Sequence, residues 1–349
     1  QQNAAFGVNS LEANTEGDNN TAVGVSALGA NQTANDNTAI GHNSLVLNTT
    51  GGDNTAVGAC SLNANTTGAN NVAVGYQALD SNTTANENVA VGRCSLFSNT
   101  EGTKNIAIGS YALDTNLTGD KNVAIGYQAL DANTTADNNV AVGDSALKAN
   151  TTGCFNVAIG ESSLASTTTG SRNTAVGRQS LYSNTTGGFN TSIGIDSMYE
   201  NTTGSNNTAV GRSAMLCNTE GACNTAIGEN ALARNTTASN NTAVGFCSLR
   251  CNTTGNYNTA IGDRSLCKNT ASNNTAIGHA SLINNTSGTS NVAVGVSSLN
   301  KNTTASNNTA VGFCSLFTNT TGAENTATGH EALKSNTTGN YNVAIGRYS

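Results

Sequence analysis

The chain has 349 residues with no Pro and no Trp, and only 10% of its residues are charged, against roughly 25% in ordinary soluble domains. Its formal net charge of −7, with 14 scattered Lys and Arg residues, provides no basic surface, so we expect no nucleic-acid partner. No apolar run approaches the roughly 18 residues of a membrane span, so we expect no membrane insertion.

One repeat of 17 residues runs through the chain. It begins with the degenerate copy at residues 4–7, and the tetrapeptide Thr/Val-Ala-Val/Ile-Gly then recurs from Thr21 to Val343, with Ile106 as one different first residue. With the degenerate copy there are 21 copies, the last incomplete. One residue is missing between Thr259 and Thr275. Numbered from the tetrapeptide, a copy reads T/V-A-V/I-G-x-x-S/A-L-x-x-N-T-T-G/A-x-x-N. We expect one uninterrupted array over residues 1–349 and, because the chain begins and ends inside a copy, a segment of a longer fibre.

A copy of 17 residues has too few large apolar residues to bury a core alone, whereas stacked copies can share one. We therefore predict an all-β, rod-shaped parallel β-solenoid of about 21 coils of 17 residues each. An antiparallel meander is disfavoured because the chain has no Asn-Gly or Asp-Gly hairpin turn. A helical repeat is disfavoured by the β-branched and Gly residues of every copy.

Each copy predicts a short strand at positions 1–3 and a tight turn at positions 11–14, for example residues 65–68. Position 3 (Val or Ile) and position 8 (Leu, except Met198 and Met215) are the predicted core. Position 2 is Ala in every copy except Ser192, and alternation along the strand places it opposite the core. A small residue there predicts close approach by a second sheet or by another chain, and Ala at a tight corner is the alternative.

Two columns of Asn recur in register. Position 17 is Asn in every complete copy, and we expect these residues to form a ladder because Asn tolerates turns and caps backbone groups. This ladder comprises Asn20, Asn37, Asn54, Asn71, Asn88, Asn105, Asn122, Asn139, Asn156, Asn173, Asn190, Asn207, Asn224, Asn241, Asn258, Asn274, Asn291, Asn308, Asn325 and Asn342. Position 11 is Asn in all complete copies but one, which has Thr167.

Position 11 allows two interpretations, a structural ladder or N-glycosylation at Asn-x-Thr/Ser. The matching residues are Asn31, Asn48, Asn65, Asn82, Asn116, Asn133, Asn150, Asn184, Asn201, Asn235, Asn252, Asn285, Asn302, Asn319 and Asn336. Asn persists where the acceptor pattern is broken, as at Asn99 and Asn218, which favours the ladder. A glycan on every rung would also be crowded at a spacing of about 4.8 Å.

Catalytic and metal-binding chemistry has little support in the sequence. His42, His279 and His330 all fall at the variable position 5 of well-separated copies, so we expect neither a metal nor another cofactor. Of the nine cysteines, Cys251 and Cys267 lie at neighbouring positions of adjacent copies and are the pair that a disulfide could join. We expect no enzymatic activity.

The motif at residues 122–129, Asn-Val-Ala-Ile-Gly-Tyr-Gln-Ala, resembles the head repeat of trimeric autotransporter adhesins (YadA-like) and related phage or viral fibre repeats. The resemblance covers the whole chain. It implies a left-handed β-roll, three chains side by side, and a surface that binds host molecules.

These observations predict a non-enzymatic structural protein that forms a rigid fibre or filament outside the cell, on the cell surface or on a virion. Its expected partners are copies of itself, side by side as a trimer or end to end. An alternative function is an adhesin whose variable positions 5, 6, 9 and 10 bind a host glycan or protein. Ice binding is a minor alternative, because the two Thr of each turn are consecutive and so do not form a flat Thr-x-Thr array.

Overall fold

The structure, a computed structural model, describes residues 2–349 as short strands joined by turns. The chain forms two compact units, Gln1–Arg172 (unit 1) and Asn173–Ser349 (unit 2). The strands of unit 1 are β1 (Ala4–Phe6), β2 (Thr21–Val23), β3 (Thr38–Ile40), β4 (Thr55–Val57), β5 (Val72–Val74), β6 (Val89–Val91), β7 (Ile106–Ile108), β8 (Val123–Ile125), β9 (Val140–Val142) and β10 (Val157–Ile159).

Unit 2 has the same construction. Its strands are β11 (Thr174–Val176), β12 (Thr191–Ile193), β13 (Thr208–Val210), β14 (Thr225–Ile227), β15 (Thr242–Val244), β16 (Thr259–Ile261), β17 (Thr275–Ile277), β18 (Val292–Val294), β19 (Thr309–Val311), β20 (Thr326–Thr328) and β21 (Val343–Ile345).

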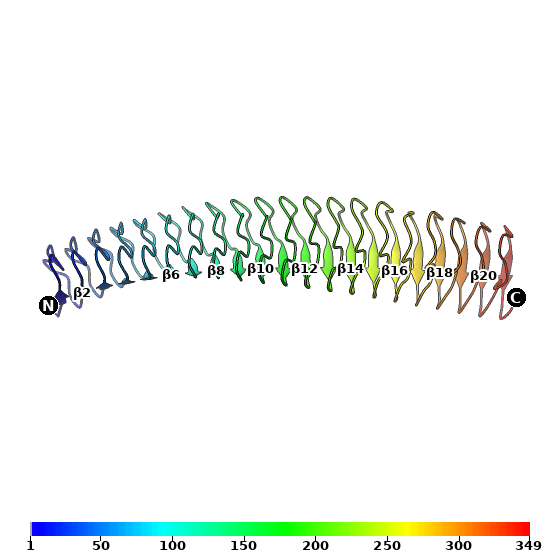
Figure 1. The fold of residues 1–349 in the computed structure, drawn as a ribbon, viewed down its shortest axis with the longest axis horizontal. Helices are drawn as coiled ribbons and strands as arrows, with labels where there is room; N and C mark the ends of the chain where they lie inside the picture. The colour runs from blue at the N-terminus through cyan, green and yellow to red at the C-terminus, as the bar shows by residue number, and fades with distance from the viewer. Residues whose placement is uncertain (1) are drawn as a thin grey trace. The chain divides into compact units, whose positions relative to one another are not determined.

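Within each unit, every strand pairs in parallel with the strand of the next coil (Figure 1). The register joins equivalent positions, so that Ala5 lies opposite Ala22 and, across the shortened coil, Ala260 lies opposite Ala276. The predicted parallel β-solenoid of 17-residue coils is therefore confirmed.

The predicted core is half right. The position 8 side chains, such as Leu130 and Met198, are fully buried, as predicted. Position 3 was assigned to the wrong side of the strand, because Ile125 is 37% exposed and Ile40 is 41% exposed. Position 2 faces the interior instead, where Ala124 is fully buried.

The interior of a coil is narrow, and this explains the small residue at position 2. The space inside each coil is already occupied by the position 8 side chain and by the two Asn columns, all of which are buried. The strand can therefore contribute only Ala inward, while its larger β-branched residues project outward. Neither a second sheet nor another chain is needed to explain the alanine column. Where Ser192 replaces Ala, its hydroxyl bonds to the Ser197 carbonyl (2.9 Å) and to the Ser180 hydroxyl (2.7 Å).

The corners of a coil require left-handed backbone conformations. The glycine at position 4 has φ near +135°, as in Gly126 (+138°), and a Cβ there would clash with the carbonyl of Gly143 in the next coil. Position 8 also has positive φ, as in Leu130 (+54°), which is unfavourable for Leu in isolation. The Leu130 N–H bonds to the Ala146 carbonyl of the next coil at 2.9 Å, so stacking holds this conformation.

Candidate interaction surfaces

The position 17 asparagines tie each coil to the next through backbone groups. Asn54 Nδ2 donates to the Gly68 carbonyl at 2.9 Å, and Asn54 Oδ1 accepts the Asn71 N–H at 3.0 Å. Equivalent bonds recur along both units, for example from Asn207 Nδ2 to the Gly221 carbonyl at 2.8 Å. These side chains are almost completely buried from Asn20 to Asn325. The predicted ladder is therefore a network of hydrogen bonds inside the solenoid.

The position 11 asparagines form a second ladder, from amide to amide. Asn65 Nδ2 donates both to Asn48 Oδ1 of the previous coil (2.8 Å) and to the Gly68 carbonyl of its own turn (2.9 Å). The Gly68 carbonyl therefore accepts from both ladders. The column is interrupted at Thr167, and Asn150 Oδ1, in the coil before it, is buried without a hydrogen-bond partner.

This geometry argues against N-glycosylation of the position 11 asparagines. Every residue with the acceptor pattern except Asn336 is 0% exposed. Attachment of a sugar would use the same Nδ2 atom that donates to two carbonyl oxygens, as it does in Asn65. The exposed group of the motif is the second Thr, because the first Thr, such as Thr66, donates its hydroxyl to the Thr83 carbonyl at 3.0 Å and is partly buried.

All nine cysteines are free thiols in the structure, including the pair Cys251 and Cys267. These two residues lie in adjacent coils, since the Cys251 N–H bonds to the Cys267 carbonyl at 2.9 Å. Burial is the main cause that raises the pKa of the Cys267 thiol, and the neighbouring Cys251 adds to it. A raised pKa keeps this thiol protonated and poorly nucleophilic.

The histidines are not brought together. His279 Nε2 lies 3.3 Å from Asp263 Oδ2, while His330 stacks on Phe313 with ring centroids 5.1 Å apart. Among residues 2–349, no group of three or more His, Cys, Asp and Glu side chains is arranged to hold a metal ion. In the same residues, no helix has the length and apolar character to cross a membrane.

The outer face of the strands is a candidate interaction surface that the sequence analysis missed. It consists of positions 1 and 3 of every coil, which are Thr, Val or Ile with few exceptions and never charged. Exposed members include Ile108 (40%) in unit 1 and Ile193 (41%) in unit 2. We call this surface the strand face. Position 3 gives this face a column of Val and Ile, and an exposed apolar column of this kind is typical of a contact with another molecule.

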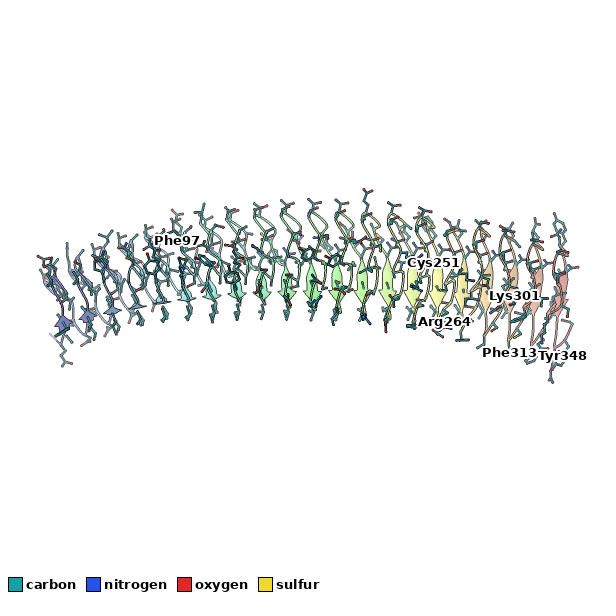
Figure 2. The ribbon with its side chains drawn as sticks, in the orientation of Figure 1. Phe97, Cys251, Arg264, Lys301, Phe313 and Tyr348 are labelled. Atoms are coloured by element: carbon teal, nitrogen blue, oxygen red, sulfur yellow. The ribbon has the colours of Figure 1, made fainter. Side chains whose placement is uncertain are left out.

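We call the surface formed by the variable positions 5, 6, 9 and 10, which follow the strand of each coil, the variable side. In unit 2, Figure 2 shows Arg264, Phe313 and Tyr348 along one edge of the coils and Cys251 away from that edge. Position 6 of one coil lies beside position 9 of the next, as shown by the 2.9 Å bond from Lys148 Nζ to Gln128 Oε1.

A column of carboxyl groups occupies part of this side in unit 1. Burial raises the pKa of Asp114 to about 6, and the charge of Asp131 in the next coil adds to the rise. Burial also raises the pKa values of Asp80 and Asp131. Asp114 Oδ1 is buried and has no hydrogen-bond partner. This carboxyl group is therefore sensitive to pH in a range where ordinary Asp side chains are not.

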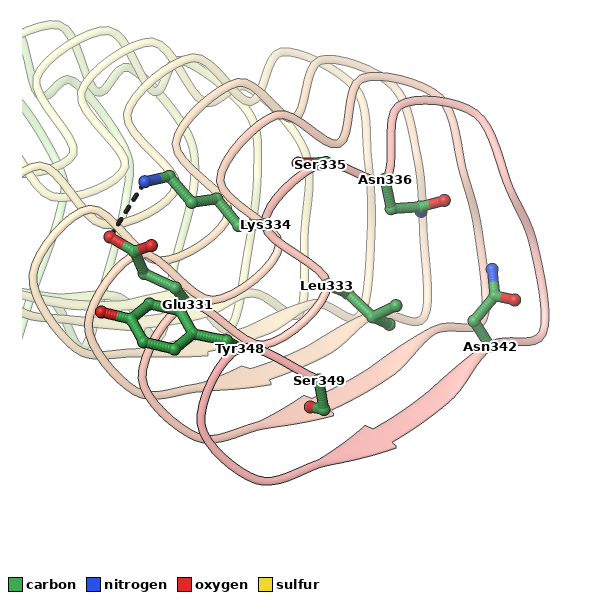
Figure 3. Close-up of a pocket in the computed structure, with 8 residues that line it drawn as sticks. All are labelled: Glu331, Leu333, Lys334, Ser335, Asn336, Asn342, Tyr348 and Ser349. Carbon is green, nitrogen blue, oxygen red and sulfur yellow. Dashed lines mark ion pairs between the residues drawn. The ribbon is translucent and has the colours of Figure 1, made fainter.

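Two hollows lie in unit 2. The larger, about 470 Å³, lies at the last coil and is lined by Leu333, Asn336 and Asn342 together with Lys334 and Glu331, whose charged atoms are 2.9 Å apart (Figure 3). Leu333, Asn336 and Asn342 occupy the core and ladder positions of the coil that begins with β20. The second hollow, about 330 Å³, lies on the variable side of β12 and β13.

Comparison with known proteins places the chain in no family. No family model matches the chain, and no curated protein is significantly similar to it. The stacked 17-residue coils, the two buried Asn ladders and the strand face are therefore the features from which a function must be argued.

Proposed function

We propose that this chain is a non-enzymatic structural protein whose copies associate side by side, through the strand face, into a fibre. The observation that carries this proposal is the uncharged and partly exposed strand face, which recurs in every coil of both units. An ordinary solvent-facing strand of an antiparallel sheet carries polar side chains, whereas this one presents Val and Ile at position 3.

The area of the strand face is sufficient for a stable contact. Each rung adds about 4.8 Å along the stack, and a three-residue strand is about 10 Å long, so each coil offers about 50 Å². The ten strands of unit 1 thus offer about 500 Å² per copy, or about 1,000 Å² for a pair, which reaches the lower bound for a specific interface. Association over many coils is favoured, since one coil alone contributes little.

The resemblance to trimeric autotransporter heads supports three chains in cross-section, and end-to-end stacking of copies is part of the same proposal. The low charge suits a structural role. We place the fibre outside the cell or on a virion, where such filaments act as spacers or display surfaces.

Sedimentation velocity of the purified chain, combined with mass per length from electron microscopy, tests the proposal. A single chain has a mass of 35.1 kDa, and we expect multiples of it at micromolar concentration. The double variant Ile125→Lys, Ile159→Lys places two charges on the strand face and should sediment as a single chain with unchanged circular dichroism. Tyr127→Lys, at an exposed position 5, is the matched control and should still associate. A monomeric wild-type chain with one chain per cross-section would refute side-by-side assembly.

A further inference from the structure

The smaller hollow of unit 2 lies between position 6 and position 9 side chains of consecutive coils. It is lined by Gln179, Asp196, Tyr199, Glu200 and Leu216, and its volume is about 330 Å³. Its lining comes from the position 6 and position 9 residues of consecutive coils, with Glu200 at position 10. The volume lies at the small end of the range for ligand pockets.

In some coils a position 9 side chain gives a polar partner to position 6 of the preceding coil. Lys148 Nζ donates to Gln128 Oε1 at 2.9 Å, and Asn300 Nδ2 donates to the Ala280 carbonyl at 3.1 Å. Asp196 occupies position 6, but the residue at position 9 of the next coil is Leu216, which has no donor.

The carboxylate of Asp196 consequently lacks hydrogen bonds that its burial requires. Its Oδ1 atom is buried, has no partner and is closed to solvent, so the carboxylate of this half-buried residue meets the hollow through its remaining edge. A partly desolvated carboxylate competes less with water for its hydrogen bonds, so a ligand hydroxyl or N–H group in the hollow could donate to it.

An aromatic platform stands beside this carboxylate. Tyr199 stacks on Tyr182 of the previous coil with ring centroids 5.1 Å apart and planes inclined by 5°. The stacking fixes the Tyr199 ring at the edge of the hollow, next to Leu216, and so provides a rigid apolar surface. Gln179 accepts a hydrogen bond from Arg178 at its Oε1 atom (3.1 Å), which leaves its amide nitrogen as a donor.

We propose that this hollow binds one hexopyranose unit of a neutral glycan. A sugar ring has an apolar C–H face for Tyr199 and Leu216, hydroxyl donors for Asp196 and Glu200, and a hydroxyl acceptor for the Gln179 amide. An alkylammonium ion would use the carboxylates and the ring but not the Gln179 N–H groups, and the guanidinium of Arg178 beside Gln179 opposes it. This inference does not depend on side-by-side assembly, although assembly would multiply a weak site.

Saturation-transfer NMR on the full chain, with methyl glycosides of glucose, galactose and mannose as separate probes, tests the site. We expect at least one glycoside to bind with a Kd of about 1–10 mM, a range typical of small exposed sites. Tyr199→Ala and Asp196→Asn should each weaken binding at least tenfold. Asp114→Asn, which also removes a carboxylate with an unpartnered buried oxygen but lies in unit 1, should bind like the wild type.

A filling variant separates binding from stability. Leu216→Lys supplies Asp196 with the partner that Lys148 gives Gln128, so it should abolish glycoside binding without lowering the melting temperature. Val46→Lys, another position 9 substitution, is the matched control and should retain binding. Methylammonium serves as a fourth probe. The proposal is overturned if no glycoside binds, or if Leu216→Lys binds glycosides as well as the wild type does. It is also overturned if methylammonium is the only probe whose binding is weakened by Tyr199→Ala.

Discussion

Removal of one amide from the position 11 ladder should destabilise the solenoid by several kcal/mol. Asn82 Nδ2 donates to Asn65 Oδ1 (2.8 Å) and to the Ala85 carbonyl (3.1 Å), and Asn82 Oδ1 accepts from Asn99 Nδ2 (3.2 Å). Each of these bonds contributes about 1 kcal/mol net, and in Asn82→Ala the buried Asn65 Oδ1 loses its donor. The Ala85 carbonyl keeps its bond from Asn71 Nδ2, and Asn99 Nδ2 keeps its bond to the Gly102 carbonyl. We therefore expect a loss of about 3–5 kcal/mol in the free energy of unfolding.

Chemical denaturation followed by circular dichroism measures the total loss, and hydrogen exchange localises it. Exchange should accelerate most in the coils that contain Asn65, Asn82 and Asn99, because each coil interacts mainly with its neighbours. The control is Thr84→Ala, which destroys the same N-glycosylation pattern at an exposed residue and should leave stability unchanged. After expression in a glycosylating host, the wild type and Thr84→Ala should differ in intact mass only by the substitution itself, because Asn82 carries no glycan. A loss below about 1 kcal/mol for Asn82→Ala would refute the ladder as a source of stability.

Two further predictions concern particular defects. Thr167→Asn should give Asn150 Oδ1 the donor it lacks and raise the stability by about 1–2 kcal/mol, and an unchanged denaturation midpoint would count against this. The pKa of Asp114 is raised to about 6 in the folded chain, so folding favours its protonated form. Its contribution to stability is fully present below about pH 4 and is lost as the pH rises to about 6. Asp114→Asn should flatten this part of the stability profile, and an identical profile in the variant would contradict the assignment.

The register of the fold could be predicted from the sequence because the same residue types recur at one spacing. Asn at positions 11 and 17 and Leu at position 8 have few substitutes, and each makes contacts in one fixed direction within the stack, as Asn65 and Leu130 show. Any offset other than one whole copy would separate the amide pairs and the core residues.

Which strand side chains point into the coil could not be predicted in the same way. Alternation along a strand shows that position 2 points away from positions 1 and 3, but it does not show which side is inside. Size suggested that Val and Ile were internal. The decisive quantity was the width of the coil, which Leu130 and the two Asn columns already fill, so that only Ala124 fits on the strand.

The hollow beside Tyr199 could not be predicted from the sequence either. It depends on the proximity of position 6 in one coil to position 9 in the next, a relation set by the turn between them. Positive φ values at positions 6 and 8, such as those of Asp196 (+55°) and Met198 (+48°), create this geometry. Asp is one of the residue types that tolerate this conformation, but position 6 varies from coil to coil and Met is not typical of it, so the sequence did not predict this geometry.

The shortened coil shows which feature controls the repeat. It lacks one turn residue, so Asn269 Nδ2 bonds to the Ala271 carbonyl two residues ahead instead of three. Asn285 Nδ2 nevertheless reaches Asn269 Oδ1 at 2.7 Å, and Thr259 still pairs with Thr275. The turn therefore adapts its length while the ladders and the strand keep their register. It follows that the period of 17 is a consequence of turn length, whereas the superposition of Asn on Asn is the condition for stacking.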